Sequence, residues 1–229
     1  MLSEEFKDFL YGIGAKLVGF ADMSGVAGCG YPRAVSVALP VPPHILREIA
    51  DGPTKSYYYM YHELNNGLNR IVTSGAEYLR ERGYSAQPQT TDAVSYDADC
   101  RSALPHKTVA VRSGLGWIGK SCLLVTPEYG SAVRISSLLT DAPLACASSV
   151  REPLCGRSCD LCRSSCPGQA LSGLLWNSAV DRDLIVDTGR CTRKQRELMM
   201  GRTGIEADIC GKCFVVCPYT AKYLSAAAK

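Results

Sequence analysis

The sequence predicts an α+β fold followed by a small cysteine-rich region. Two observations carry this prediction. Helix-like and strand-like patterns mix along residues 1–150, and eight of the 12 cysteines fall between Cys155 and Cys217. With 229 residues, of which 46% are hydrophobic and 21% charged, the chain has the composition of an ordinary globular protein. We place the boundary between the two parts near Val150, which gives domains of residues 1–150 and 151–229.

The first half of the larger domain shows two helices and two strands. Residues 3–14 place apolar side chains at helical spacing, with Ser3 as the expected N-cap. Strands are expected at 16–21 and at 35–41, the second ended by two prolines. A long helix is expected from about 55 to 82 because its apolar residues keep a 3–4 spacing. Its early tyrosines are expected to pack in the core and rim rather than to line a flat cofactor; they are Tyr57, Tyr58, Tyr59 and Tyr61.

The second half of that domain is expected to be mostly strand. Residues 86–94 resemble a strand, and PHKTVAVRSG resembles a helix. Leu123, Leu124 and Val125 favour another strand, the following PEYG a turn, and residues 131–139 a return strand. The sequence therefore predicts a hairpin around this turn.

The cysteine-rich region carries two ordered runs. The first is Cys155-x3-Cys159-x2-Cys162-x3-Cys166-Pro167, and the second is Cys210-x2-Cys213-x3-Cys217-Pro218. Thiolates at such spacing, closing on Cys-Pro, are the signature of bacterial ferredoxins, in which the fourth cysteine of a run binds the other cluster. Short helices, near 169–171 and 193–200, are expected around the cysteines.

The ligand count predicts two [4Fe–4S] clusters. The first set is Cys155, Cys159, Cys162 and Cys217. The second set is Cys166, Cys210 and Cys213, completed by the isolated Cys191. Because the first gap has three residues where ferredoxins have two, residues 156–158 must bulge. Two structural zinc sites are the alternative, which the repeated Cys-x3-Cys-Pro does not favour.

A glycine-rich segment, Gly114-Leu-Gly-Trp-Ile-Gly-Lys120, precedes the predicted hairpin. It matches G-x-G-x-x-G, the dinucleotide fingerprint, but that motif needs a strand before it and a helix after it. Here a helix-like stretch precedes the glycines and a strand-like one follows. A dinucleotide site is therefore not expected. The glycines instead allow the backbone to approach a bound group, and Lys120 adds a positive charge there.

A polar loop before this motif carries candidate proton donors. Asp99, Cys100 and His106 are selected only by their position, beside Asp97 in the same stretch. The other cysteines outside the two runs are expected to be buried or incidental; they are Cys29, Cys122 and Cys146.

Composition also limits location and partners. No run approaches 18 apolar residues, so a membrane span is not expected, and the N-terminus lacks the features of a signal peptide. Cysteines gathered at ligand spacing indicate a reducing cytoplasm rather than a disulfide framework. A net charge of +3 is too small to argue for nucleic acid.

The stretch from His106 to Leu144 resembles the epoxyqueuosine reductase family, through GLGWIGK and the TPEYG turn. The likeness continues through both cysteine runs, the isolated Cys191, and the final Val216-Cys217-Pro218-Tyr219. It implies that residues 1–150 form an α/β sandwich-like domain, with a nitroreductase-like sheet and flanking helices, that binds base-off cobalamin and is catalytic. Residues 151–229 would form a double [4Fe–4S] ferredoxin-like domain. The plan is similar to that of reductive dehalogenases.

The resemblance implies an oxidoreductase in which electrons pass through the clusters to cobalt. Gly114, Gly116, Trp117 and Lys120 match the family motif and would lie at the cofactor pocket. A low-potential ferredoxin or flavodoxin would supply electrons. The aspartate that acts as proton donor in the family would fall at Cys100, with Asp99 one position away.

Three functions follow from these observations. The first is a cobalamin- and [4Fe–4S]-dependent reductase of a small or nucleoside-like substrate. The second is an iron–sulfur electron-transfer protein without its own substrate. The third is epoxyqueuosine reduction in tRNA. The shifted acid, together with the end of the chain soon after the second run, leads us to expect that tRNA is not the partner.

Overall fold

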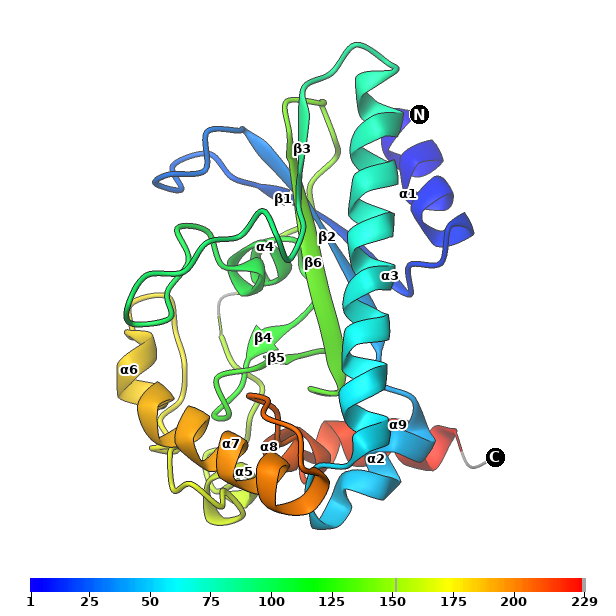
Figure 1. Ribbon diagram of the computed structural model, residues 1–229. Coiled ribbons are helices and arrows are strands. Elements are labelled where there is room, and N and C mark those ends of the chain that lie inside the picture. The colour runs from blue at the N-terminus through cyan, green and yellow to red at the C-terminus, as the bar shows by residue number, and fades with distance from the viewer. Residues whose placement is uncertain (151, 228–229) are drawn as a thin grey trace. The chain divides into compact units, whose positions relative to one another are not determined.

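The computed structural model describes residues 1–150 and 152–227 (Figure 1). The chain divides into two compact units. The first contains residues 1–39, 63–116 and 134–150, and the second contains residues 40–62, 117–133 and 151–229. The predicted boundary at Val150 is one of several points at which the chain passes between units. Residues 40–62 and 117–133 belong to the same unit as the cysteine-rich segment, so each unit is discontinuous in sequence.

The first unit is built on a four-stranded sheet with the order β1-β2-β6-β3. The strands are β1 (Leu17–Asp22), β2 (Arg33–Pro40), β3 (Ala86–Gln89) and β6 (Val133–Thr140). β1 runs antiparallel to β2, pairing Phe20 with Val35, and β3 runs antiparallel to β6, pairing Ala86 with Thr140. β2 and β6 have long buried stretches, as expected for strands that are central in the sheet.

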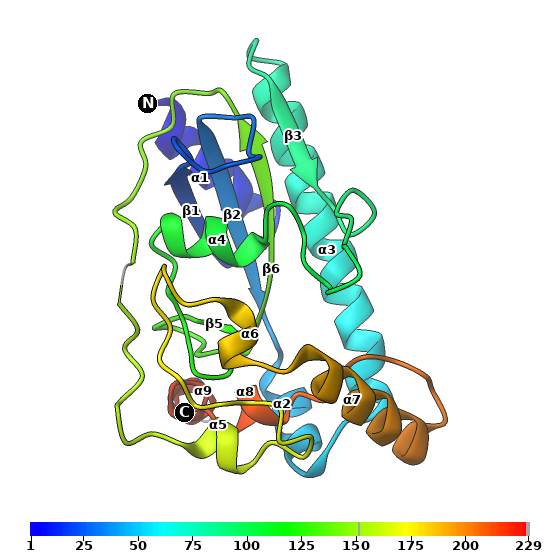
Figure 2. The same ribbon diagram turned by 90° about the vertical axis from the view of Figure 1, so that its left-hand side faces the viewer.

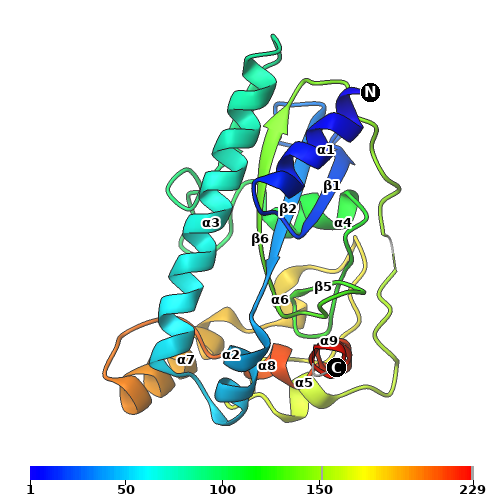
Figure 3. The same ribbon diagram turned by 90° about the vertical axis from the view of Figure 1, so that its right-hand side faces the viewer.

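Helices cover both faces of this sheet. α1 (Leu2–Gly12) and α3 (Lys55–Arg80) lie against one face, and α4 (His106–Arg112) lies against the other (Figures 1–3). The core beneath α1 and α3 consists of fully buried side chains such as Phe6, Leu10 and Leu138. Phe6 stacks on Phe20 and Tyr78, with ring centroids 6.1 and 5.1 Å apart. Burial of these apolar faces is what stabilises the layers.

The second unit is made of short elements around the cysteines. They are α2 (Pro43–Glu48), η1 (Ile49–Asp51), the hairpin strands β4 (Trp117–Ile118) and β5 (Leu124–Val125), α5 (Leu161–Ser164), α6 (Arg182–Ile185), α7 (Thr188–Thr203), α8 (Lys212–Val215) and α9 (Pro218–Ala226). α5 and α8, which each carry cysteines, lie side by side (Figure 2). Lys212 Nζ donates to Ala50 O at 2.6 Å, which ties η1 to α8.

The elements predicted within residues 1–150 agree with the structure within a few residues, with three exceptions, and α2 and η1 were not predicted. Ser3 is not the N-cap of α1; Met1 is, and Ser3 Oγ accepts a hydrogen bond from Ala145 N. β3 ends at Gln89, well before the predicted end at residue 94. Residues 123–125 pair with Trp117–Ile118 rather than with the return strand, because β6 is taken up by the larger sheet.

Two further differences concern the cysteine-rich segment. Residues 169–171 are not helical: Gln169 has φ +49° and Leu171 bridges to Val186. The predicted helix at 193–200 is real but longer, extending over Thr188–Thr203 as α7. Asp187 caps this helix, accepting a hydrogen bond from Arg190 N at 2.8 Å, and Gly204 ends it in the left-handed region. None of the helices among the described residues is long and apolar enough to cross a membrane.

Candidate functional site

The seven cysteines of the two runs and the isolated Cys191, all half-buried, form two groups in the second unit. Around Cys162 the sulfurs of Cys155, Cys159 and Cys217 exert a direct electrostatic influence. Burial, together with these neighbours, raises the pKa of the Cys162 thiol to about 11. The first predicted ligand set is therefore gathered in space. Cys217 reaches it from the end of the chain, immediately before α9.

The second group forms around Cys213, which lies in α8. Burial raises the pKa of its thiol, and the sulfurs of Cys210, Cys191 and Cys166 raise it further. The sulfur of Cys162 also acts on Cys213, so the two groups are neighbours. Cys191 enters from α7, where burial and the sulfurs of Cys166 and Cys210 raise its pKa to about 11. Cys191, the isolated cysteine, thus lies with Cys166, Cys210 and Cys213, the group that had only three members from the two runs.

A zinc site and an iron–sulfur cubane differ in how far apart their thiolates stand. Within residues 1–150 and 152–227, no three Cys, His, Asp or Glu side chains converge closely enough to share a single metal ion. A zinc ion needs four sulfurs about 2.3 Å from one point. In a cubane each cysteine binds a different iron, so its four thiolates stand further apart.

The hairpin of β4 and β5 lies against the cysteine loops. Gly119 allows a close approach: a Cβ there would lie 3.5 Å from Cys155 Sγ and 2.8 Å from a methyl carbon of Val125. Lys120, which is 7% exposed, donates to the carbonyl oxygens of Arg157 and Cys159, both at 2.8 Å. The hairpin therefore holds the residues between the first two cysteines, where the extra residue was predicted to bulge.

Trp117, at the start of the hairpin, is almost completely buried. Its ring packs edge-on against Tyr219, with centroids 4.9 Å apart. Trp117 Nε1 has no hydrogen-bond acceptor among the described residues. A buried donor without a partner is costly, so this indole N–H fits a site in which a bound group supplies the acceptor.

The predicted proton donors lie in the first unit and have different surroundings. Asp99 and Cys100 lie in an exposed loop, with Cys100 at φ +56°. Asp97 organises this loop, because its carboxylate accepts hydrogen bonds from the backbone N–H groups of Asp99 and Arg101, at 3.0 and 2.8 Å. The sequence analysis did not assign this role to Asp97. An aspartate in a polar loop is nevertheless a turn signal, because its side chain can accept hydrogen bonds from backbone N–H groups that follow it.

His106 begins α4 and is half-buried. Its Nδ1 lies 2.8 Å from Ser137 Oγ on β6. Burial lowers the pKa of His106 to about 4, and the nearby positive charge of Arg134 adds to the effect. The imidazole is therefore neutral near pH 7.

The remaining predicted residues are placed as follows. Gly114, with φ +77°, ends α4, and a Cβ there would lie 3.1 Å from Ser148 O. Gly116 follows two residues later. Of the incidental cysteines, Cys29 and Cys122 are buried and Cys146 is half-buried. Cys122 shares a buried cluster with Cys162, Cys166, Cys191 and Cys213, a position that the sequence did not indicate.

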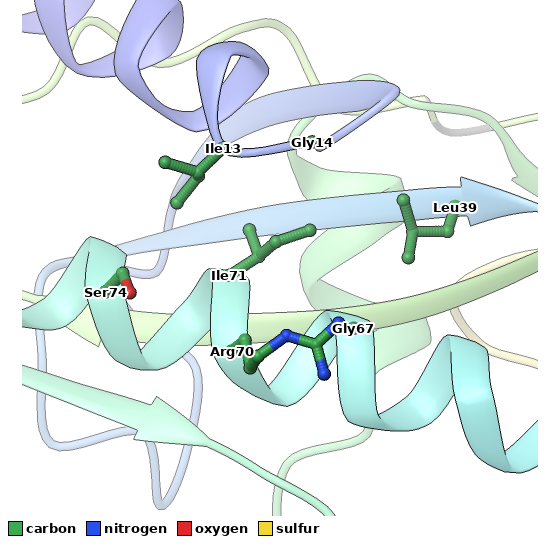
Figure 4. Close-up of a pocket in the computed structure, with 7 residues that line it drawn as sticks. All are labelled: Ile13, Gly14, Leu39, Gly67, Arg70, Ile71 and Ser74. Atoms are coloured by element: carbon green, nitrogen blue, oxygen red, sulfur yellow. The ribbon is translucent and has the colours of Figure 1, made fainter.

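A shallow pocket of about 350 Å³ is found elsewhere in the first unit (Figure 4). It lies between the end of α1, β2 and α3, and is lined by Ile13, Gly14, Leu39, Gly67, Arg70, Ile71 and Ser74. None of the predicted site residues lines it.

Comparison with known proteins gives consistent results. No protein-family profile matches the chain. It is 37% identical over 118 residues to an epoxyqueuosine reductase of Listeria monocytogenes, covering 51% of this chain and 30% of that protein. It is 31% identical over 166 residues to the Aliivibrio fischeri enzyme, covering 69% of this chain and 39% of the relative.

The chain is a divergent, partial relative of the epoxyqueuosine reductases. In both comparisons it spans well under half of the relative's length. Solved structures show the same fold. A catabolic reductive dehalogenase superposes with a TM-score of 0.76 and 19% identity, over 98% of this chain and 33% of that one. A mixed α/β fold of this kind is thus confirmed, while the nitroreductase-like and ferredoxin-like details remain predictions.

One prediction from the sequence is wrong. We expected tRNA not to be a partner, from the shifted acid and the short chain. An epoxyqueuosine reductase solved with an epoxyqueuosine-modified tRNA-Tyr stem loop superposes with a TM-score of 0.62 and 20% identity, over 96% of this chain and 65% of that one. The named relatives carry the same activity in their names. The expectation failed because a one-residue shift in an exposed loop is a weak argument about a whole partner class.

Proposed function

We propose that this protein is a cobalamin- and [4Fe–4S]-dependent reductase. The observation that carries the proposal is the pair of four-cysteine groups in the second unit, assembled from three separate parts of the chain. Such groups suit clusters that pass single electrons at potentials set by charge, hydrogen bonds and burial. The relatives are oxidoreductases by name, which supports the same class of reaction here.

The first cluster would be held by Cys155, Cys159, Cys162 and Cys217, and the second by Cys166, Cys191, Cys210 and Cys213. The repeated Cys-x3-Cys-Pro of the two runs supports clusters over zinc. Cysteine binds iron as the thiolate, so proton release would accompany cluster assembly.

Cobalamin is the cofactor that the resemblance adds. Gly114, Gly116 and Trp117 are the residues of the matched motif that we assign to its pocket. The buried indole N–H of Trp117, which has no acceptor among the described residues, supports a bound group with acceptor atoms. When bound in base-off form, the corrinoid would supply a strongly reducing cobalt centre.

Proton delivery falls to the loop before α4. His106 is the least suitable of the three candidates, because its lowered pKa of about 4 leaves it neutral and without an acidic proton to give near pH 7. Asp99 and Cys100 lie on a loop that Asp97 shapes through two backbone hydrogen bonds. We propose that one of these two donates the proton, and separate Asp99→Asn and Cys100→Ala variants would show which.

The substrate that the relatives favour is epoxyqueuosine in tRNA. α7 contains five basic residues and one acidic residue, so its net charge is +4 (5 − 1). The net charge of the whole chain is +3. Ion pairs with Asp187, Glu197 and Asp208 neutralise three of these basic side chains, so the helix by itself does not argue for a phosphate backbone.

The decisive experiment is anaerobic purification with added cobalamin. About eight irons and one cobalt per chain, with turnover of epoxyqueuosine in a tRNA stem loop by single-turnover assay, would support the proposal. Iron and cobalt with no turnover of this RNA would leave the reductase assignment intact but remove the tRNA substrate. Zinc in place of iron would refute both.

An electron-transfer protein without its own substrate is the second candidate. The observation that favours it is the departure at the proton-donor position, where Cys100 stands. It predicts about eight irons but no retained cobalt in the same experiment.

A further inference from the structure

Lys120, which the resemblance assigns to the cofactor pocket, contacts the backbone of a cysteine loop. It lies at the tip of the β4–β5 hairpin, which is closed by hydrogen bonds from Gly119 N to Leu123 O (2.9 Å) and from Cys122 N to Gly119 O (2.8 Å). Its ammonium group donates to the carbonyl oxygens of Arg157 and Cys159. Both residues belong to the loop that joins the first two cysteines of the first group.

This ammonium group is close to the sulfur of Cys159. Nζ is 2.8 Å from the carbonyl oxygen of Cys159, and covalent geometry places the Sγ of the same residue within about 5 Å of that oxygen. The charge is therefore no more than roughly 8 Å from a predicted cluster ligand. Gly119, next in sequence, approaches Cys155 of the same group.

The positive charge of Lys120 has no acidic side chain beside it among the described residues. The side chain is 7% exposed, and among the described residues no carboxylate forms an ion pair with it. A buried cation needs a compensating negative charge, and two neutral carbonyl dipoles supply only part of it. Four thiolates and an iron–sulfur core carry a net negative charge, which becomes more negative on reduction.

We propose that Lys120 is a positioning residue that raises the reduction potential of the cluster at Cys155, Cys159, Cys162 and Cys217. This inference rests on the proposed presence of clusters and extends it to a named residue. A cation at this distance stabilises the reduced cluster more than the oxidised one. The two hydrogen bonds hold the cation in place.

The other cysteine group has a lysine of its own, which gives a matched comparison. Lys212 adjoins Cys213 in sequence and donates to Ala50 O at 2.6 Å. It lies two residues from Cys210, which belongs to the same group. The two lysines therefore stand beside different groups, and the same substitution at each should affect different clusters.

The test is a redox titration of the anaerobically purified protein, followed by EPR, on wild type, Lys120→Gln and Lys212→Gln. Glutamine removes the charge but keeps an NH2 group that can donate to two carbonyls. We expect Lys120→Gln to keep about eight irons. One midpoint should fall by about 60 mV, which is a roughly tenfold loss in the equilibrium constant for one-electron reduction. Lys212→Gln should lower the other midpoint.

The outcomes separate this inference from the proposed function. Wild type without iron would refute the clusters themselves. Wild type with two clusters and a Lys120→Gln protein with unchanged midpoints would refute only the role of Lys120. If Lys120→Gln loses iron, the Lys120→Arg variant, which keeps the positive charge, decides between two explanations. A Lys120→Arg protein that keeps its iron and the wild-type midpoints would support the role of the charge. A Lys120→Arg protein that also loses iron would mean that Lys120 only holds the loop.

Discussion

Replacing Gly130 by alanine should displace Cys217 and destabilise the second unit. Gly130 has φ +59°, the left-handed region in which a Cβ is unfavourable by roughly 1–2 kcal/mol. A Cβ there would also lie 2.6 Å from Thr220 Oγ1 and 2.6 Å from the carbonyl carbon of Tyr219. These atoms belong to the first turn of α9, which begins directly after Cys217.

The clash cannot be relieved by moving a flexible side chain. Thr220 is fully buried and accepts a hydrogen bond from Ser131 N at 3.2 Å. Tyr219 is tied to Leu154 O through its hydroxyl group, which donates at 3.1 Å. Loss of one such hydrogen bond costs about 1 kcal/mol. With the backbone strain, the total is roughly 3 kcal/mol, which corresponds to a fall in Tm of about 6–12 °C for a chain of this size.

The assay is anaerobic thermal unfolding with iron analysis of Gly130→Ala beside Gly201→Ala. Gly201 lies within α7, and a Cβ there would meet nothing within 4 Å. The control should be unchanged or more stable by up to about 1 kcal/mol, since alanine is the better helix former. The Gly130 variant should melt lower and lose iron. A Gly130→Ala protein with the wild-type Tm and about eight irons would refute the reasoning about Cys217.

Three further predictions test other parts of the structure. Cys191→Ser should reduce the iron content from about eight to about four, while Cys100→Ala should keep both clusters; iron loss in the second variant would contradict the ligand assignment. Because the pKa of His106 is lowered in the fold from 6.5 to about 4, the unfolded chain binds more protons between these values, so stability should fall as the pH drops from 6.5 toward 4. His106→Gln should flatten this part of the stability profile, measured by urea unfolding; an unchanged profile would show that other groups cause it. Leu138→Ala, at a fully buried site beneath α1 and α3, should cost about 2–5 kcal/mol by the same measurement, and a cost below about 1 kcal/mol would contradict its place in the core.

The sequence by itself determined which cysteines we grouped together. Their spacing separated two runs, and the count left Cys191 as the fourth member of the second group. The structure gathers Cys191 with Cys166 and Cys210, as that count predicts. Most helices and strands of residues 1–112 were also predictable, because the periodicity of apolar residues is a local property that burial of one face imposes.

Only the tertiary structure decided which partners the local elements found. Residues 123–125 and 131–139 both had strand patterns, but β6 pairs with β3 in the large sheet and β5 pairs with β4, a choice that depends on contacts between distant residues. The motif alone assigned Lys120 to a cofactor pocket, and nothing local indicated its hydrogen bonds to Arg157 and Cys159, which depend on how the hairpin meets a loop nearly 40 residues later. Local pattern fixes the type of an element and the chemistry of its side chains, while neighbours far along the chain fix what each side chain touches.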